Sequence, residues 1–294
     1  MEVHTLTYKL KLATRPAKIF IGIPTGWVKE YALLYLLAAL RGLDYNPNYF
    51  KVVFAVTNMQ DKESKKFIRD LKAILRHSNF FFKTEVISTK ITTKDKKRWG
   101  PYAAVIKNVK MLRKKFLKED YEFFLKLDAD IPPLRTTLQR LLALEADIAS
   151  PLLFQRPVKA FCMGSNQAFP LVFKHIWTLE DLEEHNLNPE QKRILTQAWI
   201  NLSFTRCIHL DTNWKTFKTL RGVSFGAGCM LVTREAFTQI PYELAHIPYS
   251  GDATLSGYQS EDLQFCQEAL AKGFETAVDL ELHCPHLCMD GKAY

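Results

Sequence analysis

The sequence lacks the features that mark secreted and membrane proteins. No run approaches the roughly twenty apolar residues that a membrane-spanning helix needs, and the longest, YALLYLLAAL at 31–40, is about half that length. The first eighteen residues, MEVHTLTYKLKLATRPAK, contain neither the apolar core nor the small-residue cleavage site of a signal peptide. We therefore expect a cytoplasmic protein.

Paired cysteines are also missing. The six cysteines form no C-x-x-C pair, and as small apolar core residues they suit a reduced compartment. One segment, HCPHLC at 283–288, places two histidines and two cysteines within six positions. A structural zinc site normally draws its ligands from two separated pairs, and no second pair is visible, so the sequence disfavours structural zinc.

Acidic residues are scarcer than basic ones. The chain has 31 Asp and Glu against 40 Lys and Arg, a net charge of +9. This excess favours acidic partners, which include nucleotide diphosphates, anionic lipid headgroups and nucleic acid. The main basic block, KDKKRW at 94–99, is interpreted as a solvated loop.

What the chain does have is a regular alternation of strand and helix patterns. A length of 294 residues, 47% of them hydrophobic, is sufficient for a substantial core. The alternation predicts an α/β fold with a mostly parallel sheet and helices on both faces. We expect one domain over 1–294, with a first half at about 18–150 and a less regular second half at about 151–294. The expected strands are 18–25, 51–58, 80–88, 121–130, 147–154 and 276–287, and the expected helices are 26–44, 61–78, 102–119 and 261–274. Residues 224–237 are expected to form a glycine-rich turn, a short strand and the start of a helix.

The segment FLKLDADIPP at 124–133 places two carboxylates at the end of a strand. Side chains alternate along a strand, so Asp128 and Asp130 should point the same way. Pro132 and Pro133 cannot donate ladder hydrogen bonds, so we expect the strand to end at about Ile131. Two like charges in one small volume indicate a raised pKa or a bound cation. A turn-forming role for Asp130 is the alternative.

Several motifs in a fixed order resemble those of GT-A fold glycosyltransferases of the family 2 type or related mannosyltransferases. They are IFIGIPT, AAVIKNVKML, LDAD, FGAGCMLVTREAF, EDLQFCQEALAKGF and a closing strand that carries histidine. The resemblance spans about residues 18–288. It implies a Rossmann-like, nucleotide-sugar-binding first half and an acceptor-binding second half. The implied reaction is metal-dependent, inverting transfer of a sugar from a nucleotide-diphosphate donor to a hydroxyl of a glycan, lipid-linked or protein-linked acceptor.

The resemblance also implies roles for individual residues. Asp130 would bind Mn²⁺ or Mg²⁺ directly, Asp128 would contact the ribose or reach the metal through water, and His283, with His286 as the alternate, would complete the ligands. Asp262 would be the general base beside Glu261, although acidic residues at a helix start are also favoured by the helix dipole. The remaining residues implied to bind the nucleotide sugar are Pro24, Thr25, Thr57, Asn58, Lys107, Gly226, Ala227 and Gly228.

Alternatives stay open at this point. A sugar-nucleotide nucleotidyltransferase would usually carry a longer glycine-rich basic loop after the first strand than TGWVKEY at 25–31. A basic nucleic-acid-binding protein would not need these acidic residues at converging element ends, and we expect no specific nucleic acid partner. The alternating LTYKLKL at the N-terminus suits peripheral contact with anionic membrane and a lipid-linked acceptor; a soluble acceptor is equally open. The segment YSGDATLSGYQS at 249–260 is expected to close over the donor.

Overall fold

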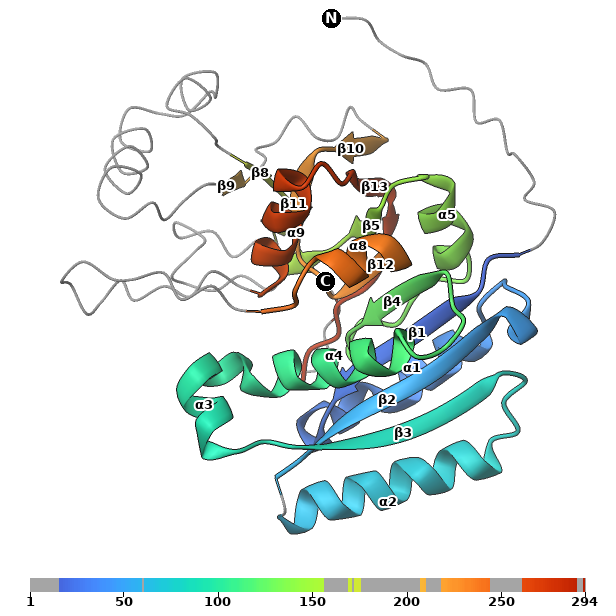
Figure 1. Ribbon diagram of the computed structural model, residues 1–294. Coiled ribbons are helices and arrows are strands. Elements are labelled where there is room, and N and C mark those ends of the chain that lie inside the picture. The colour runs from blue at the N-terminus through green and yellow to red at the C-terminus, as the bar shows by residue number, and fades with distance from the viewer. Residues whose placement is uncertain are drawn as a thin grey trace, which may run out of the picture.

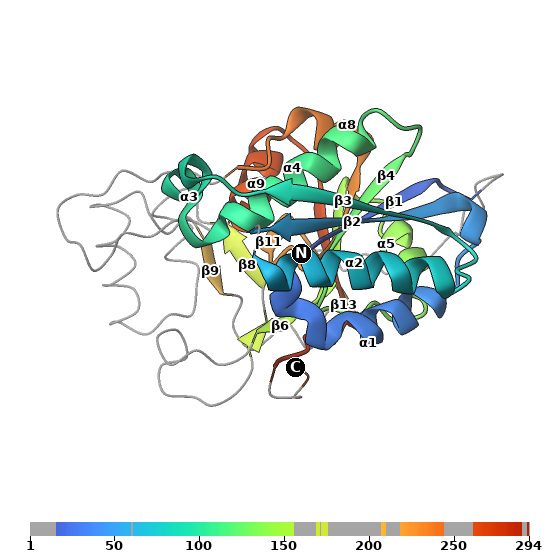
Figure 2. The ribbon, with the colours of Figure 1, turned by 90° about the horizontal axis from the view of Figure 1, so that it is seen from below.

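The protein is a three-layer α/β structure in a computed structural model, which describes residues 16–59, 61–155, 169–170, 172–175, 207–209, 218–243, 261–289 and 293. Helices α1, α2 and α5 cover one face of the main sheet, and α4, α8 and α9 cover the other (Figures 1 and 2). The mostly parallel sheet flanked by helices that the sequence predicts is confirmed. The helices are α1 Glu30–Arg41, α2 Lys62–His77, α3 Thr93–Trp99, α4 Ala103–Phe116, α5 Thr137–Ala143, α8 Arg234–Gln239 and α9 Glu261–Ala271, with short 3-10 turns η1 Trp27–Lys29, η2 Pro47–Tyr49 and η3 Gly100–Tyr102.

Strands from both halves of the chain form this eight-stranded sheet, in the order β10-β13-β5-β12-β4-β1-β2-β3. β1 pairs in parallel with β2 and β4, β2 with β3, and β5 with β13, whereas β12 runs antiparallel between β4 and β5 and β10 runs antiparallel to β13. The strands are β1 Ile19–Thr25, β2 Phe50–Asn58, β3 Lys83–Lys90, β4 Phe123–Leu127, β5 Ile148–Leu152, β10 Thr219–Arg221, β12 Cys229–Thr233 and β13 Thr276–His283. Smaller sheets join β11 Val223–Phe225 with β8 Val172–His175 and β9 Cys207–His209, and β6 Phe154–Gln155 with β7 Phe169–Pro170.

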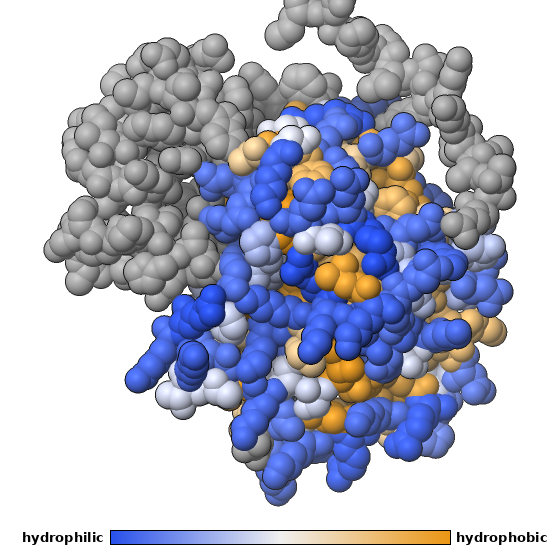
Figure 3. All heavy atoms as spheres, in the orientation of Figure 1, coloured by the Kyte–Doolittle hydropathy of each residue, from blue (hydrophilic) through white to orange (hydrophobic). Residues whose placement is uncertain are grey.

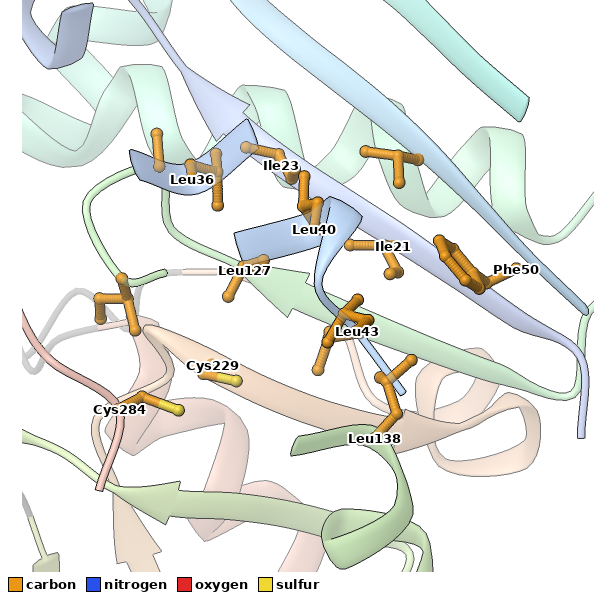
Figure 4. Packing of buried hydrophobic residues seen from close by; sticks show 14 of the residues in the cluster. Ile21, Ile23, Leu36, Leu40, Leu43, Phe50, Leu127, Leu138, Cys229 and Cys284 are labelled. Carbon is orange, nitrogen blue, oxygen red and sulfur yellow. The ribbon is translucent and has the colours of Figure 1, made fainter. Parts of the chain in front are cut away.

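The core holds the first strand rigidly in the centre of the sheet. All seven residues of β1 are buried, because alternate side chains face α1 on one side and α4 on the other. On the α1 side, Ile21 and Ile23 pack with Leu36 and Leu40 (Figure 4). A buried strand end of this kind can hold side chains at the edge of the sheet in fixed positions.

Three local predictions were wrong. β4 ends at Leu127 and not near Ile131, because the chain then turns: the Ile131 N–H donates to the Asp128 carbonyl over 3.0 Å. The basic block at 94–99 is helix α3 and not a loop, because Thr92 and Asp95 form a reciprocal capping box at its N-terminus. The last strand also ends at His283, four residues earlier than expected.

Some expectations fall outside the described residues. These are the N-terminal LTYKLKL segment and the 249–260 segment expected to close over a ligand. None of the described helices is long and apolar enough to cross a membrane. The face seen in Figure 3 presents mainly hydrophilic side chains with small hydrophobic patches between them.

Candidate active site

A cleft opens at the carboxyl ends of β1, β2 and β4, the edge at which α/β sheets bind ligands. Its volume is about 690 Å³, which is within the size range of small-molecule sites. Segments far apart in the sequence meet here, because parallel strands end at the same edge. The cleft is lined by Pro24, Thr25, Gly26, Trp27, Val28, Lys29, Thr57, Met59, Tyr102, Ala104, Val105, Asn108, Asp128, Ala129, Asp130 and Glu261.

Asn108 ties together the strand ends that form one wall of the cleft. This buried side chain on α4 donates from Nδ2 to the hydroxyl of Thr57 over 2.9 Å and to the carbonyl of Thr25 over 3.4 Å. Its carbonyl oxygen accepts a hydrogen bond from the Thr89 hydroxyl at the end of β3. The Thr25 hydroxyl is buried and has no hydrogen-bond partner among the described residues. It is a buried polar group whose hydrogen bond the described residues do not supply.

Asp130 collects three donors on one carboxylate oxygen, although its side chain is only 4% exposed. The Lys29 ammonium, the Tyr31 hydroxyl at 3.2 Å and His286 Nε2 at 3.3 Å all contact Oδ2. Burial acts to raise the pKa of Asp130, but the His286 hydrogen bond and the Lys29 charge outweigh it and hold the pKa well below its ordinary value. Asp130 is therefore ionised and surrounded by positive charge.

His286 reaches Asp130 because the segment after β13 docks on the turn that carries this carboxylate. The Leu287 N–H donates to the Asp130 carbonyl over 2.8 Å, and the Leu287 carbonyl accepts from the Tyr31 hydroxyl. The first-choice histidine of the sequence analysis, His283, lies elsewhere: its Nε2 is 2.7 Å from the Leu280 carbonyl. The structure thus brings the alternate histidine, and not the first choice, to the carboxylate.

Asp128 is paired with a buried lysine of the preceding strand, β4. Lys126, with a side chain only 3% exposed, donates from Nζ to Asp128 Oδ1 and to the Ala227 carbonyl, each over 2.7 Å. Burial acts to lower the pKa of Lys126, but Asp128 and Glu261 outweigh it and raise the pKa. Desolvation raises the pKa of Asp128 in turn, and the Lys126 charge opposes this rise. This ion pair holds the Asp128 side chain in place at the first residue of the turn from Asp128 to Ile131.

The glycine-rich segment before β12 supports this turn from behind. The Asp128 N–H donates to the Gly228 carbonyl over 2.7 Å. A Cβ on Gly228 would lie 2.1 Å from Cδ1 of Ile131, so the turn packs where a side chain would otherwise stand. Gly226, Ala227 and Gly228 do not line the cleft. Ala227 and Gly228 instead contact residues that shape the cleft, through the Lys126–Ala227 and Asp128–Gly228 hydrogen bonds.

The acidic pair at the start of α9 divides between two environments. Glu261 lines the cleft and is 8% exposed, and its Oε2 has no partner among the described residues. Burial, with the neighbouring Asp262 charge, raises the pKa of Glu261 to about 7. Asp262 is held by backbone donors, the Ala227 N–H at 3.1 Å to Oδ2 and the Leu263 N–H at 2.9 Å to Oδ1. The two carboxylates are adjacent, but only Glu261 faces the cleft.

Two other residues expected at the site lie away from the cleft. Lys107 forms an ion pair with Asp95 of α3, so its ammonium is directed along the helix pair and not toward the Asp128–Asp130 turn. Asn58 ends β2 but does not line the cleft. Pro24, Thr25 and Thr57 lie on it as expected.

A divalent cation fits this site only in part. Within the described ranges, no three His, Cys, Asp or Glu side chains form a metal-binding group. Asp130 and His286 are nevertheless adjacent, and a carboxylate with an imidazole is a donor pair that Mn²⁺ accepts. Nucleotide-bound metals commonly use one or two protein ligands, with phosphate oxygens and water as the others. The pair is suitable for such an ion once the Lys29 ammonium has left Asp130.

Sequence reasoning missed three of the residues that shape the site. Lys126 could have been found, because it precedes Asp128 by two positions on a strand and so shares its face. Lys29 and Tyr31 could not, because their contacts to Asp130 span about a hundred residues of chain. No local pattern reports a contact of that length.

Comparisons with known proteins add a general likeness of fold. No family model matches the chain, and no curated protein matches it. Among solved structures, the chain is similar to TarS 1-349 of S. aureus (TM-score 0.48, 14% identity, 91% of this chain and 59% of that chain) and to the same fragment in complex with UDP-GlcNAc (0.48, 15%, 91% and 57%). It is also similar to the mannosyltransferase PcManGT from Pyrobaculum calidifontis in complex with GDP-Man and Mn²⁺ (0.47, 13%, 95% and 59%). The chain thus spans less than two thirds of each of these chains. Similarity at this level assigns no role to any residue, and function has to be inferred from the cleft.

Proposed function

We propose that this chain is a GT-A type glycosyltransferase that transfers a sugar from a nucleotide-diphosphate donor to a hydroxyl acceptor. The observation that supports this most is the meeting of Asp128, Asp130, Lys29 and His286 at the carboxyl ends of β1 and β4. Carboxylates and cations placed together at a strand edge suit a ligand that carries both phosphate and a metal ion.

The wall beside β1 and β2 would bind the nucleoside. Pro24, Thr25 and Thr57 line it, and Trp27 and Tyr102 add aromatic surface. The buried Thr25 hydroxyl, which has no partner among the described residues, would bond a polar group of the base or ribose once the ligand fills the cleft. Asp128, held by Lys126, would accept a hydrogen bond from a ribose hydroxyl.

Asp130 and His286 would hold a divalent cation, with Mn²⁺ favoured by the imidazole. Such an ion neutralises the charge that develops on the leaving diphosphate as the glycosidic bond breaks. Lys29 adds a positive charge on the same side of the cleft.

Asp262 is proposed as the general base that removes the acceptor proton in an inverting transfer. Its two backbone hydrogen bonds fix the orientation of the carboxylate, which a base requires. Each carboxylate oxygen has a second lone pair, so both can still accept from a hydroxyl. The acceptor hydroxyl would belong to a glycan, a lipid-linked or a protein-linked acceptor.

The nucleotidyltransferase alternative is less well supported. β1 is followed by Gly26 and the single turn η1 and then directly by α1. A triphosphate-binding loop of the usual length has no room between these elements.

The test is a thermal-shift screen of UDP, GDP and CDP and their sugars, each with Mn²⁺ and with EDTA. Ligands that bind the native state raise its melting temperature, so the nucleotide is identified by its shift. We expect at least one diphosphate to stabilise the protein in Mn²⁺ but not in EDTA, and Asp130→Asn to lose this difference while it remains folded. Equal stabilisation in Mn²⁺ and EDTA would contradict metal dependence, and no stabilisation by any nucleotide would contradict the proposed function.

A further inference from the structure

Lys29 lies directly after β1, at the edge of the sheet where the cleft opens. It ends η1 directly after β1, where its backbone N–H closes the turn on the Gly26 carbonyl over 2.9 Å. The turn directs its side chain, which is 39% exposed, across the cleft to Asp130 Oδ2. A positive charge on the protein therefore lies where the carboxylate would bind a metal ion.

The surroundings of Asp130 leave little room for a second cation on the same oxygen. Oδ2 also accepts from Tyr31 and lies beside His286 Nε2, and the carboxylate is almost completely buried. An ion bound by Asp130 and His286 would be in contact with the Lys29 ammonium, and like charges at that separation repel strongly. Metal binding here requires the ammonium to move.

A phosphate group bound in the cleft would be a second partner for the Lys29 ammonium. Lys29 is a flexible side chain with part of its length in solvent, and the cleft that it lines also contains Thr25, Gly26 and Asp128. A diphosphate bound beside these residues would be within its reach. Lysine is a common point-charge partner for phosphate.

We propose that Lys29 is an exchange cation, which neutralises Asp130 in the metal-free protein and moves to the donor's diphosphate when a divalent ion binds Asp130. This inference rests on the proposed function, since it assumes a diphosphate ligand. Metal alone must displace the ammonium into water, whereas metal with a diphosphate gives it a new partner. The two ligands are therefore coupled, and each strengthens the binding of the other.

The test compares Mn²⁺ affinity, measured by electron paramagnetic resonance titration of the full chain, with and without UDP or GDP. Lys29→Met removes the charge and keeps most of the length of the side chain. We expect Lys29→Met to bind Mn²⁺ alone about tenfold more tightly than the wild type, and to bind the diphosphate in Mn²⁺ about tenfold less tightly; a tenfold change corresponds to about 1.4 kcal/mol. Lys29→Arg keeps the charge and should retain weak binding of Mn²⁺ alone.

Lys18 offers a matched control at the other end of β1. Its side chain is 35% exposed and pairs with Asp120 at 2.6 Å, outside the cleft. Lys18→Met should change neither affinity. Thermal unfolding gives a second readout: metal-free Lys29→Met should melt below the wild type, because Asp130 has lost a partner, and Mn²⁺ should restore more of its stability than it adds to the wild type.

Each negative result has a distinct meaning. If Lys29→Met binds Mn²⁺ alone no more tightly than the wild type, while both bind the diphosphate, the exchange is overturned and the proposed function stands. If diphosphate affinity is unchanged in Lys29→Met, the second half of the exchange is overturned. If neither protein binds Mn²⁺ or any diphosphate, both proposals fail together.

Discussion

Lys126 donates a hydrogen bond from Nζ to Oδ1 of Asp128 over 2.7 Å, and this pair joins the carboxyl end of β4 to the loop that carries Asp130. The lysine is buried in the middle of the sheet, where an unpaired ammonium would be strongly disfavoured. Its second bond, to the Ala227 carbonyl, connects the same group to the glycine-rich segment before β12. One buried charge therefore organises two of the segments that shape the cleft.

We expect Lys126→Met to reduce the free energy of unfolding by about 3 kcal/mol, because it leaves Asp128 and the Ala227 carbonyl without their partner. A double-mutant cycle with Asp128→Asn checks the reason, since removing both partners should cost less than the sum of the two single substitutions. Urea unfolding of the four proteins gives the coupling energy. A coupling near zero would contradict the assigned role of the ion pair.

Asn108→Ala should affect both stability and ligand binding. The variant leaves the Thr25 carbonyl and the Thr57 and Thr89 hydroxyls without the amide that joins them, which we expect to cost about 2 to 3 kcal/mol. Because Thr25 and Thr57 line the cleft, nucleotide affinity should also fall. Lys114→Ala, on the exposed side of the same helix, is the control for both measurements. If nucleotide affinity is unchanged while stability falls, the strand ends do not bind the nucleoside.

Most of the sheet could be predicted from the sequence, because its signals are local. The buried apolar run of β1 and the amphipathic pattern of α2 each lie in one continuous stretch. Where a local signal was overlooked, the prediction was wrong: Thr92 and Asp95 have capping-box spacing, and they start α3 in a segment expected to be a loop. β4 ends early because the chain turns where the Ile131 N–H donates to the Asp128 carbonyl, whereas the position of Pro132 and Pro133 predicts an end near Ile131.

The candidate site could be predicted only as a set of strand and helix ends. Strand alternation and the resemblance name Asp128, Asp130 and the pair Glu261 and Asp262, and all of these except Asp262 line the cleft. Which histidine lies beside Asp130 depends on how the chain docks after β13: the Leu287 N–H donates to the Asp130 carbonyl, and this places His286 there. The partners of each charge, Lys29 for Asp130 above all, depend on tertiary packing.

The buried carboxyl of Glu261 should make stability depend on pH. Burial and the Asp262 charge raise its folded-state pKa from 4.5 to about 7, so the folded protein holds more protons than the unfolded chain between these values. This contribution to stability is therefore fully present below about pH 4.5 and is lost as the pH rises through about 7, a change on the order of 3 kcal/mol. Glu261→Gln should consequently be more stable relative to the wild type at pH 8 than at pH 5.

Chemical unfolding of both proteins at these two pH values checks this prediction. Glu235→Gln is the matched control, because Glu235 also lies in the first turn of a helix but is exposed. If the stability difference between Glu261→Gln and the wild type is the same at pH 5 and pH 8, Glu261 does not titrate in this range.

The two acidic residues that begin α9, Glu261 and Asp262, should have separable effects on the reaction. Glu261 lines the cleft, whereas Asp262 is outside its lining and accepts from the Ala227 and Leu263 N–H groups. We expect Asp262→Asn to slow sugar transfer by about 10² to 10⁴-fold, the usual contribution of a general base, with donor affinity nearly unchanged. Glu261→Gln should change donor affinity, because it removes a negative charge beside the diphosphate at pH 8.

Single-turnover release of the nucleoside diphosphate measures the transfer rate, and titration with the donor measures its affinity. Transfer by Asp262→Asn at the wild-type rate would show that Asp262 only holds the backbone N–H of Ala227. The base would then have to be another residue.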